Sequence, residues 1–164
     1  MQSVTLPSRR EMMEPFEIDE VKNYSDLLVA SFAQMTKRRL VEGGADLSRR
    51  LFEAPFALVS HGTEEDPIFK YANRTALTLW GMSWEEFTVM PSRLSAEPML
   101  QAERNQLLEE AQRKGYVDTY QGVRFAKDGR RFTIKDTVLW NVADAWNIRQ
   151  GQACVIYRWD YLPV

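Results

Sequence analysis

The strongest constraint on the fold lies in the last third of the chain, where a turn joins two extended segments. The turn is Lys127-Asp128-Gly129-Arg130, whose Asp-Gly pair suits the positive φ angles of a tight hairpin. It separates Tyr120–Ala126 from Arg131–Val142, and the second segment alternates between apolar and polar residues, which predicts a strand with one buried face. A loop through Asp144–Gln150 then leads to a last strand, Gln152–Trp159, which is apolar on both sides. The apolar positions of the alternating strand are Phe132, Ile134, Val138, Trp140 and Val142.

Helical patterns lie on both sides of the middle of the chain. Apolar residues recur every three to five positions over Asn23–Val41, which predicts an amphipathic helix ended by the glycine pair at 43–44. A short helix is expected at Asp46–Phe52. A longer helix is expected at Met99–Lys114, with Gly115 as its C-cap.

Two short strands are expected between these helical regions. They are Phe56–His61 and Ile68–Tyr71, joined by the turn-forming sequence GTEEDP. Asn73 stands at the N-cap position of a helix over Arg74–Trp80, and a capping box formed by Ser83 and Glu86 starts another helix.

The resulting order of elements resembles that of a PAS-type domain. Such a domain is α+β, and we expect an antiparallel five-stranded sheet with helices over one face and a cavity between helices and sheet. We divide the chain into a flexible leader (1–22), an N-terminal helical extension (23–53) and the PAS-like domain (54–164). The helical extension either covers the other face of the sheet or pairs with a second copy of the chain.

Composition excludes several classes of function. The 164 residues include 21 Lys and Arg against 23 Asp and Glu, so the net charge of −2 lacks the basic excess of a nucleic-acid binder. No apolar run approaches the roughly 18 residues of a membrane-spanning helix, and no signal peptide is visible. One His and one Cys cannot supply a typical zinc site, and a single Cys fits the reducing cytoplasm.

Three stretches of the sequence resemble the MEKHLA family, a PAS-related domain of bacteria, algae and plant class III homeodomain–leucine zipper proteins. They are LFEAPFALVSHGTEEDPIFKYANRTALTLWGMSW, MPSRLSAEP and GYVDTYQGVRFAKDGRRFTIKDTVLWNV. The resemblance covers about residues 46–159. It implies a PAS-like fold and a sensory or interaction role with no established reaction. The chain lacks the literal M-E-K-H-L-A string and a homeodomain or zipper, so the plant transcriptional role does not carry over.

Two charged residues interrupt apolar patterns and are candidates for the cavity. Asp136 occupies the face otherwise given to apolar residues. Arg104 lies on the apolar stripe of the long helix, which is formed by Leu100, Leu107, Leu108 and Ala111. Burying a lone carboxylate costs several kcal/mol unless it is paired or a bulge turns it outward. We therefore hypothesise that Arg104 and Asp136 face the cavity, either as a structural ion pair or as an anchor for a small ligand.

Further candidate ligand-binding residues have a structural alternative beside each functional one. His61, the single imidazole, is either a pH- or ligand-responsive group or the cap of a strand end. Gln152 resembles the glutamine that contacts flavin in photosensory PAS domains, although Cys154 lies outside their GxNCRFLQ-type motif and fits a buried small hydrophobe. Arg93, beside two serines, either binds an anion or lies in a capped turn. Trp140 is either core or a stacking surface for a planar ligand.

Three functions remain open from the sequence. The favoured one is a non-enzymatic PAS-like sensory, ligand-binding or interaction module that signals through a partner, with no cofactor identified. The alternative is a small α+β enzyme that uses His61 or Asp136 as acid or base in an apolar pocket. The third is a dimerisation unit built on the helix at Asn23–Val41.

Overall fold

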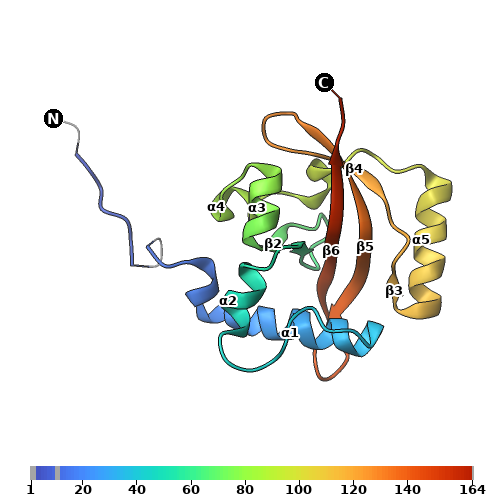
Figure 1. The fold of residues 1–164 in the computed structure, drawn as a ribbon, viewed down its shortest axis with the longest axis horizontal. Helices are drawn as coiled ribbons and strands as arrows, with labels where there is room; N and C mark the ends of the chain where they lie inside the picture. Colours follow the sequence, from blue (N-terminus) through green and yellow to red (C-terminus); the bar gives the residue numbers. More distant parts are fainter. Residues whose placement is uncertain (1–2, 10–11, 164) are drawn as a thin grey trace.

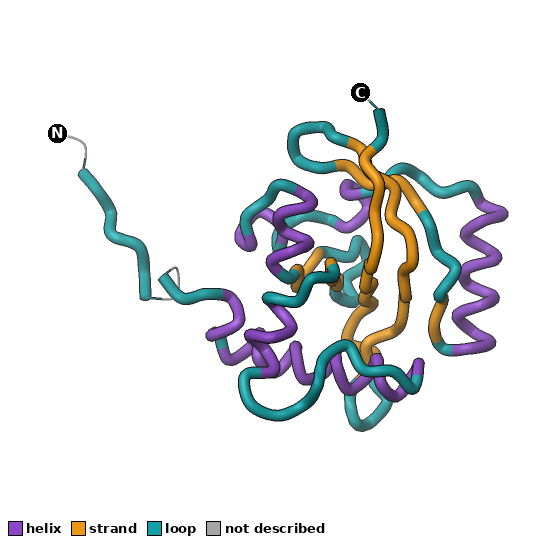
Figure 2. Tube along the Cα trace, viewed as in Figure 1, coloured by secondary structure: helices purple, strands orange, loops and turns teal. Residues whose placement is uncertain are grey.

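The computed structural model describes residues 3–9 and 12–163 of the chain. Parts of the expected leader, at positions 1–2 and 10–11, therefore lie outside the described residues, as does position 164. Residues 3–9 extend away from the body of the protein, as Figure 2 shows. The next elements are a single turn, η1 (Pro15–Glu17), and helix α1 (Asp19–Thr36), which begins four residues before the predicted start at Asn23.

Helices cover both faces of the central sheet (Figure 1). Helix α1 packs on one face, together with the short helix α2. This result matches the first of the two expectations for the N-terminal extension. The other face meets α3, α4 and α5, whose side chains pack against one shared core cluster. In Figure 1, α3 and α4 lie to the left of β5 and β6, and α5 lies to the right. The elements after α1 are α2 (Leu47–Phe52), α3 (Arg74–Trp80), α4 (Trp84–Phe87), the 3-10 turn η2 (Ser92–Ser95) and α5 (Gln101–Lys114).

The predicted caps of the middle helices are confirmed. The Asn73 side chain accepts a hydrogen bond from the backbone N–H of Ala76, and Ser83 and Glu86 form the reciprocal capping box. Gly115 ends α5 with a φ of 85°, a conformation that glycine adopts without strain. These short polar signals fix where each helix begins and ends.

The end of α1 differs from the prediction. The helix stops at Thr36 because Lys37 takes a left-handed conformation, φ 62°, well before the glycine pair at 43–44. The Thr36 hydroxyl donates to the carbonyl of Phe32 and accepts from the N–H of Arg38, which holds the chain in this turn.

The sheet is antiparallel, and within residues 12–163 it has six strands in the order β2-β1-β6-β5-β3, with β4 also paired to β5. The predicted α+β PAS-like class is confirmed, whereas the predicted count of five strands is one short. The missed strand is β3, whose two residues are too few to show an alternating pattern. The strands are β1 (Ala57–His61), β2 (Phe69–Ala72), β3 (Tyr116–Val117), β4 (Gly122–Phe125), β5 (Arg131–Ala143) and β6 (Arg149–Tyr161).

Strands β5 and β6 bend together at Asp136 and Tyr157. Asp136 has a φ of 50° and its side chain is exposed. Beyond the bend Thr137 lies opposite Ile156, in the same register as the pairs before it. Asp136 in β5 and Tyr157 in β6 therefore each interrupt the alternation of side chains in their strand. Beyond these two residues, the side chains that faced one side of the β5–β6 pair face the other side.

The exchange of faces shows why the sequence pattern of β5 was misleading. Before the bend, Phe132 and Ile134 belong to the core cluster shared with α3 and α4, whereas Val138 and Trp140 belong to the cluster under α1. Unbroken alternation had placed all four residues on one face. Asp136 makes the change at little cost because aspartate tolerates the left-handed region better than most residues.

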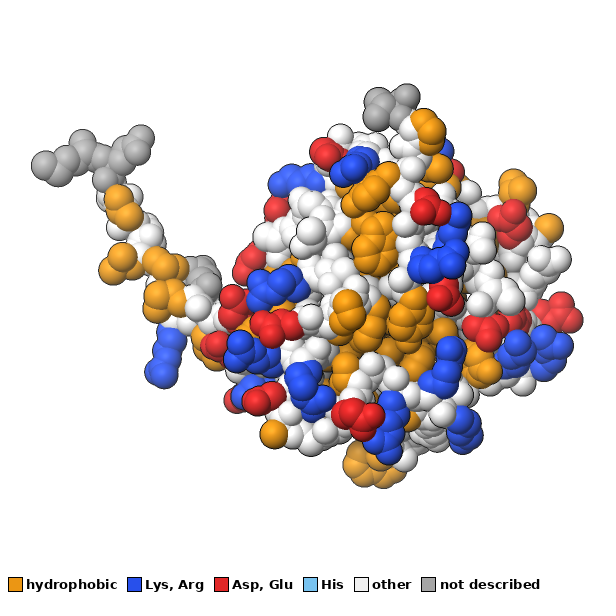
Figure 3. Space-filling model, viewed as in Figure 1, with side chains coloured by type: hydrophobic (Ala, Val, Ile, Leu, Met, Phe, Trp, Pro, Cys, Tyr) orange, Lys and Arg blue, Asp and Glu red, His pale blue; other side chains and the backbone are white. Residues whose placement is uncertain are grey.

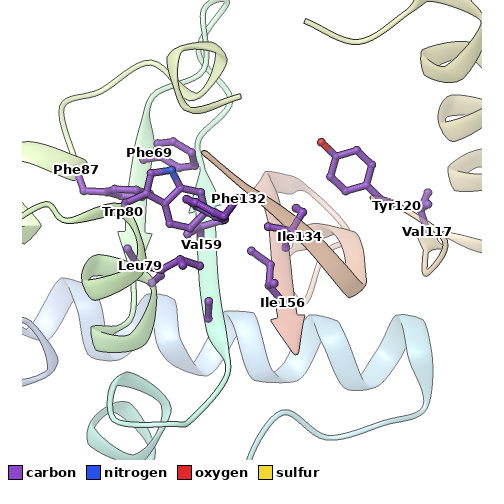
Figure 4. Close-up of a cluster of buried hydrophobic side chains, with 14 residues drawn as sticks. Val59, Phe69, Leu79, Trp80, Phe87, Val117, Tyr120, Phe132, Ile134 and Ile156 are labelled. Carbon is purple, nitrogen blue, oxygen red and sulfur yellow. The ribbon is translucent and has the colours of Figure 1, made fainter. Parts of the chain in front are cut away.

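The core cluster below the middle helices is rich in aromatic side chains (Figure 4). Trp80 packs edge-on against Phe132, with ring centroids 5.1 Å apart, and against Phe87 at 5.7 Å. Tyr120 and Val117 lie at the other end of this cluster in Figure 4. Trp80, Phe87 and Phe132 are each at most 1% exposed, so these rings lie in the interior of the protein.

The surface carries charges of both signs. On the face drawn in Figure 3, basic and acidic side chains are interspersed and no single basic stripe is present. No described helix is long and apolar enough to cross a bilayer.

Candidate functional site

A cavity of about 550 Å³ lies between α5 and the sheet. Its volume falls within the range of small-molecule sites in proteins. Apolar side chains from β1, β5, β6, α3 and α5 form most of its walls, with polar groups at a few positions. The lining includes Val59, His61, Phe69, Trp80, Arg93, Met99, Arg104, Leu107, Leu108, Ala111, Val117, Tyr120, Arg124, Leu139, Gln152 and Cys154.

Helix α5 forms one wall of this cavity and contacts the rest of the protein sparingly. None of its fourteen residues, all of which are described, is buried. Of the predicted stripe, Leu107, Leu108 and Ala111 line the cavity, and Arg104 lines it from the preceding turn. Leu100 is exposed and does not line it. The helix therefore covers the cavity without closing it.

A hydrogen-bonded pair forms part of the polar lining. His61 and Gln152 are opposite each other across β1 and β6, and His61 Nε2 lies 3.3 Å from Gln152 Oε1. His61 Nδ1 lies 2.9 Å from the carbonyl oxygen of Gly62, which can only accept, so Nδ1 carries a proton.

The protonation of His61 decides which end of the Gln152 amide faces it. A doubly protonated ring donates from Nε2 to the amide oxygen, whereas a neutral ring accepts there from the amide NH₂. The other end of the amide is then available to a ligand, either as donor or as acceptor. This pair can therefore present either kind of hydrogen-bonding group to the cavity.

The backbone of Gln152 is also tied to the opposite face of the sheet. Ser60 Oγ donates to the carbonyl oxygen of Gln152 at 2.8 Å, so the Tyr24 hydroxyl must be the donor in its 2.7 Å bond to Ser60 Oγ. Burial raises the pKa of Tyr24 to about 12, which keeps this donor protonated at neutral pH. Gln152 thus links the cavity to α1.

Three arginines line the cavity. Arg93 donates from Nε to both carboxylate oxygens of Asp66 at 3.2 Å, on the surface. Arg124 reaches in from β4, half-buried, with its guanidinium 5.2 Å from the centre of the Tyr120 ring. Arg104 on α5 has a more exposed side chain. The cavity therefore has a positive rim around apolar walls.

Cys154 lies in the wall formed by β6. The thiol is buried, and burial raises its pKa to about 12 although the nearby charge of Arg124 acts in the opposite direction. Such a thiol is almost fully protonated at neutral pH and is a poor nucleophile. Its predicted role as a small buried hydrophobe agrees with this environment.

The structure brings together four of the six predicted site residues: His61, Gln152, Arg93 and Arg104. The other two lie elsewhere. Asp136 is exposed at the bend and does not line the cavity, so the hypothesis of an Arg104–Asp136 pair facing it is wrong. The physical reason is the left-handed backbone at Asp136, one of the arrangements that turns a carboxylate outward.

For Trp140 the structure confirms the core alternative and not the stacking one, and the core that holds it is the cluster under α1. It is buried under α1, where its Nε1 donates to Ser31 Oγ at 3.0 Å and its ring meets Phe32 edge-on at 4.8 Å. Arg124, which the sequence reading did not single out, takes a place in the cavity instead. The only signal for this role in the sequence is that Arg124 is a cation placed between the apolar residues Val123 and Phe125.

A second hollow of about 640 Å³ lies between the N-terminal segment, α1 and α4. It is lined by Met13, Pro15, Tyr24, Lys70 and Trp84 among others. None of the predicted site residues lines it. Among the described residues, no three His, Cys, Asp or Glu side chains are grouped so as to hold a metal ion.

An antiparallel sheet with α1 on one face and a helix-covered cavity on the other defines a PAS-type domain. The family model of the MEKHLA domain matches residues 22–161, and the chain belongs to this family. The match includes most of α1 as well as the sheet. No curated protein matches the chain.

Solved structures with the same fold are photoreceptor and PAS domains. The light-state dimer of the fungal blue-light photoreceptor Vivid has a TM-score of 0.56 at 17% identity, over 90% of this chain and 99% of that one. The PAS domain of a protein from Colwellia psychrerythraea has a TM-score of 0.55 at 16% identity, over 66% and 90%. An RNA-binding light-oxygen-voltage receptor has a TM-score of 0.54 at 25% identity, over 67% of this chain and 31% of the receptor. This chain thus corresponds to about a third of that receptor.

Proposed function

We propose that this protein is a non-enzymatic sensory module that binds a small molecule in the cavity between α5 and the sheet. The observation that carries the proposal is the cavity itself: about 550 Å³, apolar walls and the His61–Gln152 pair among its lining. Sites of this size with few polar groups among apolar ones are the usual form of ligand pockets. The fold neighbours named as photoreceptors support a sensory role.

The same architecture supplies a route for a response. A ligand that moves Gln152 would act on the bond from Ser60 to its carbonyl, and so on the Tyr24 contact with α1. We propose that the module then acts on a partner protein through its outer surface. The division into leader, helical extension and domain remains a prediction.

Two finer parts of the proposal concern assembly and location. A homodimer is supported by the Vivid dimer among the fold neighbours, but the apolar stripe of α1 is already packed on its own sheet. Any contact through α1 would therefore use its solvent-facing side. A cytoplasmic location is supported by the single, buried and unpaired Cys154. We expect no nucleic-acid partner, because the net charge is −2.

Mass spectrometry of the purified protein, in native and denatured form and with an absorption spectrum, tests the proposal. A ligand retained from the host cell would appear as extra native mass, and visible absorbance would indicate a chromophore. Ala111→Phe should abolish the extra mass because it adds a large side chain to the cavity wall from α5, a helix in which no residue is buried. Gln112→Phe, one position along and outside the cavity lining, is the matched control.

The outcome that would contradict the proposal is equally concrete. Extra mass that survives Ala111→Phe would place the ligand elsewhere on the protein. The second contradicting result has two parts: no extra mass is retained, and no apolar dye binds in a way that Ala111→Phe weakens. The protein would then not be a ligand sensor, and a protein-interaction module would be the better interpretation.

A further inference from the structure

The charges around the helix–sheet cavity are unbalanced. Its described lining contains three arginines and one histidine, and it contains no aspartate or glutamate. This is unusual for a chain with 23 acidic and 21 basic residues in total. One arginine, Arg93, is neutralised by Asp66 outside the cavity. The two remaining arginines decide the character of the site.

Arg104 has no ion pair and no side-chain hydrogen bond within the described part of the chain. The acidic residues of α5 do not compensate it. Glu103, Glu109 and Glu110 line an adjoining groove, which shares Met99, Leu107 and Tyr120 with the cavity, and Glu110 is bonded to Lys114 and Thr119. The guanidinium of Arg104 is therefore available at the rim of the cavity.

Arg124 is held in place without a carboxylate partner among the described residues. It is half-buried and stacked on Tyr120, and its charge reaches the β6 wall, where it acts on the pKa of Cys154. A guanidinium fixed by stacking has its donors oriented for the two oxygens of a carboxylate or phosphate. Because it is partly removed from water, it gains more from an anion than a fully exposed arginine would.

The rest of the cavity favours an apolar body. Much of the wall is apolar, and a polar or multiply charged molecule would lose its hydration there without gaining hydrogen bonds. The apolar side chains are those of Leu107, Leu108, Leu139, Phe69 and Val59. A cationic ligand would be repelled by both arginines, and a neutral one would leave their donors to water.

We propose that the ligand of this cavity is an amphipathic organic anion, whose apolar body lies between α5 and the sheet and whose carboxylate or phosphate head is bound by Arg104 and Arg124. This inference rests on the proposed ligand-binding function and adds the chemical class of the ligand. The head lies toward the rim, where both guanidinium groups are within reach of solvent, and the body lies along the leucines of α5.

The experiment compares two dyes that differ in one charge. The probes are 8-anilinonaphthalene-1-sulfonate and its uncharged parent, N-phenyl-1-naphthylamine, titrated into the full chain and followed by dye fluorescence. We expect the sulfonate to bind at least about tenfold more tightly, since a hydrogen bond to a charged group is worth about one decade or more in affinity. The difference should shrink as salt is raised.

Variants locate the effect. Arg104→Gln and Arg124→Gln should each weaken the sulfonate roughly tenfold and leave the uncharged dye unchanged, whereas Arg124→Lys should retain part of the affinity. Arg113→Gln, on α5 but outside the cavity, is the control. Competition with dodecanoate and with dodecyl phosphate, at concentrations below their micelle formation, then distinguishes a carboxylate from a phosphate head.

The two failures are distinguishable. Equal affinity for both dyes, with binding lost in Ala111→Phe, would overturn the anionic class and keep the ligand-binding function. Binding of both dyes that ignores Ala111→Phe would overturn both proposals, because the dyes would then occupy another surface. Tighter binding of the sulfonate that is unaffected by both Arg→Gln variants would also overturn the assignment of the head group.

Discussion

Gly151 is the position at which a single methyl group should cost most. A Cβ there would overlap the carbonyl oxygen of His61 in β1 and lie 2.9 Å from the Tyr24 hydroxyl. The backbone oxygen cannot move without disturbing the β1–β6 pairing. Tyr24 cannot move without losing its bond to Ser60.

The expected loss follows from these two contacts. Overpacking of a filled site costs about 1–3 kcal/mol, and a lost buried hydrogen bond adds about 1 kcal/mol. Gly151→Ala should therefore lower the free energy of unfolding by about 3 kcal/mol, which corresponds to a fall in Tm of roughly 6–12 °C for a chain of this size. Gly43→Ala is the control, since a Cβ at position 43 meets nothing within 4 Å.

Urea denaturation followed by circular dichroism and tryptophan fluorescence measures the effect, together with a thermal scan. A free energy of unfolding for Gly151→Ala within about 0.5 kcal/mol of the parent value would refute the reasoning. Helix α1 would then not pack as closely on the sheet as the Tyr24–Ser60 contact requires. A loss of similar size in Gly43→Ala would refute it as well, since that change introduces no contact.

Three further predictions concern other parts of the fold. Asn73 is fully buried and its side chain makes four hydrogen bonds, so Asn73→Ala should lower the free energy of unfolding by about 3–5 kcal/mol in urea denaturation. Ser83→Ala, at an exposed cap, should lower it by about 1 kcal/mol, and equal losses in the two variants would contradict this prediction. Asp136→Val should destabilise by about 1–2 kcal/mol because valine resists the left-handed region, while Asp136→Gly should be neutral or stabilising in the same assay. The thiol of Cys154, whose pKa is raised to about 12, should react with iodoacetamide at pH 8 only after unfolding. Rapid labelling of the folded protein would contradict the burial of this thiol. Because the thiol ionises near pH 8.5 in the unfolded chain, its contribution to stability is complete below that pH and is lost as the pH rises toward 12.

The sequence predicted the elements of this fold well because their boundaries carry local signals. Asn73, Ser83 and Gly115 are short-range caps, and the Asp-Gly turn before β5 defines a hairpin without reference to the rest of the chain. The helix–sheet cavity followed from the order of elements. The start of α1 and its end at Thr36 were less accurate, since neither has a glycine or proline to mark it.

The composition of the site was harder to predict than its location. Asp136 was correctly recognised as an anomaly in the alternation, but its consequence for Trp140 depends on a backbone angle that no residue pattern states. The His61–Gln152 contact depends on the register between β1 and β6, strands separated by most of the domain. Arg124 enters the cavity only because β4 pairs with the part of β5 before the bend.

The bend at Asp136 and Tyr157 bears on how the length of this chain can change. Each of these residues is surplus to the alternation of its strand, and the side chains on either side keep their cores without it. Removal of both residues would shorten the β5–β6 pair by one residue in each strand and leave its alternation regular. Removal of only one would leave the other as a β-bulge in its strand. Insertions and deletions in this arm should therefore be tolerated best as matched pairs, one in each strand.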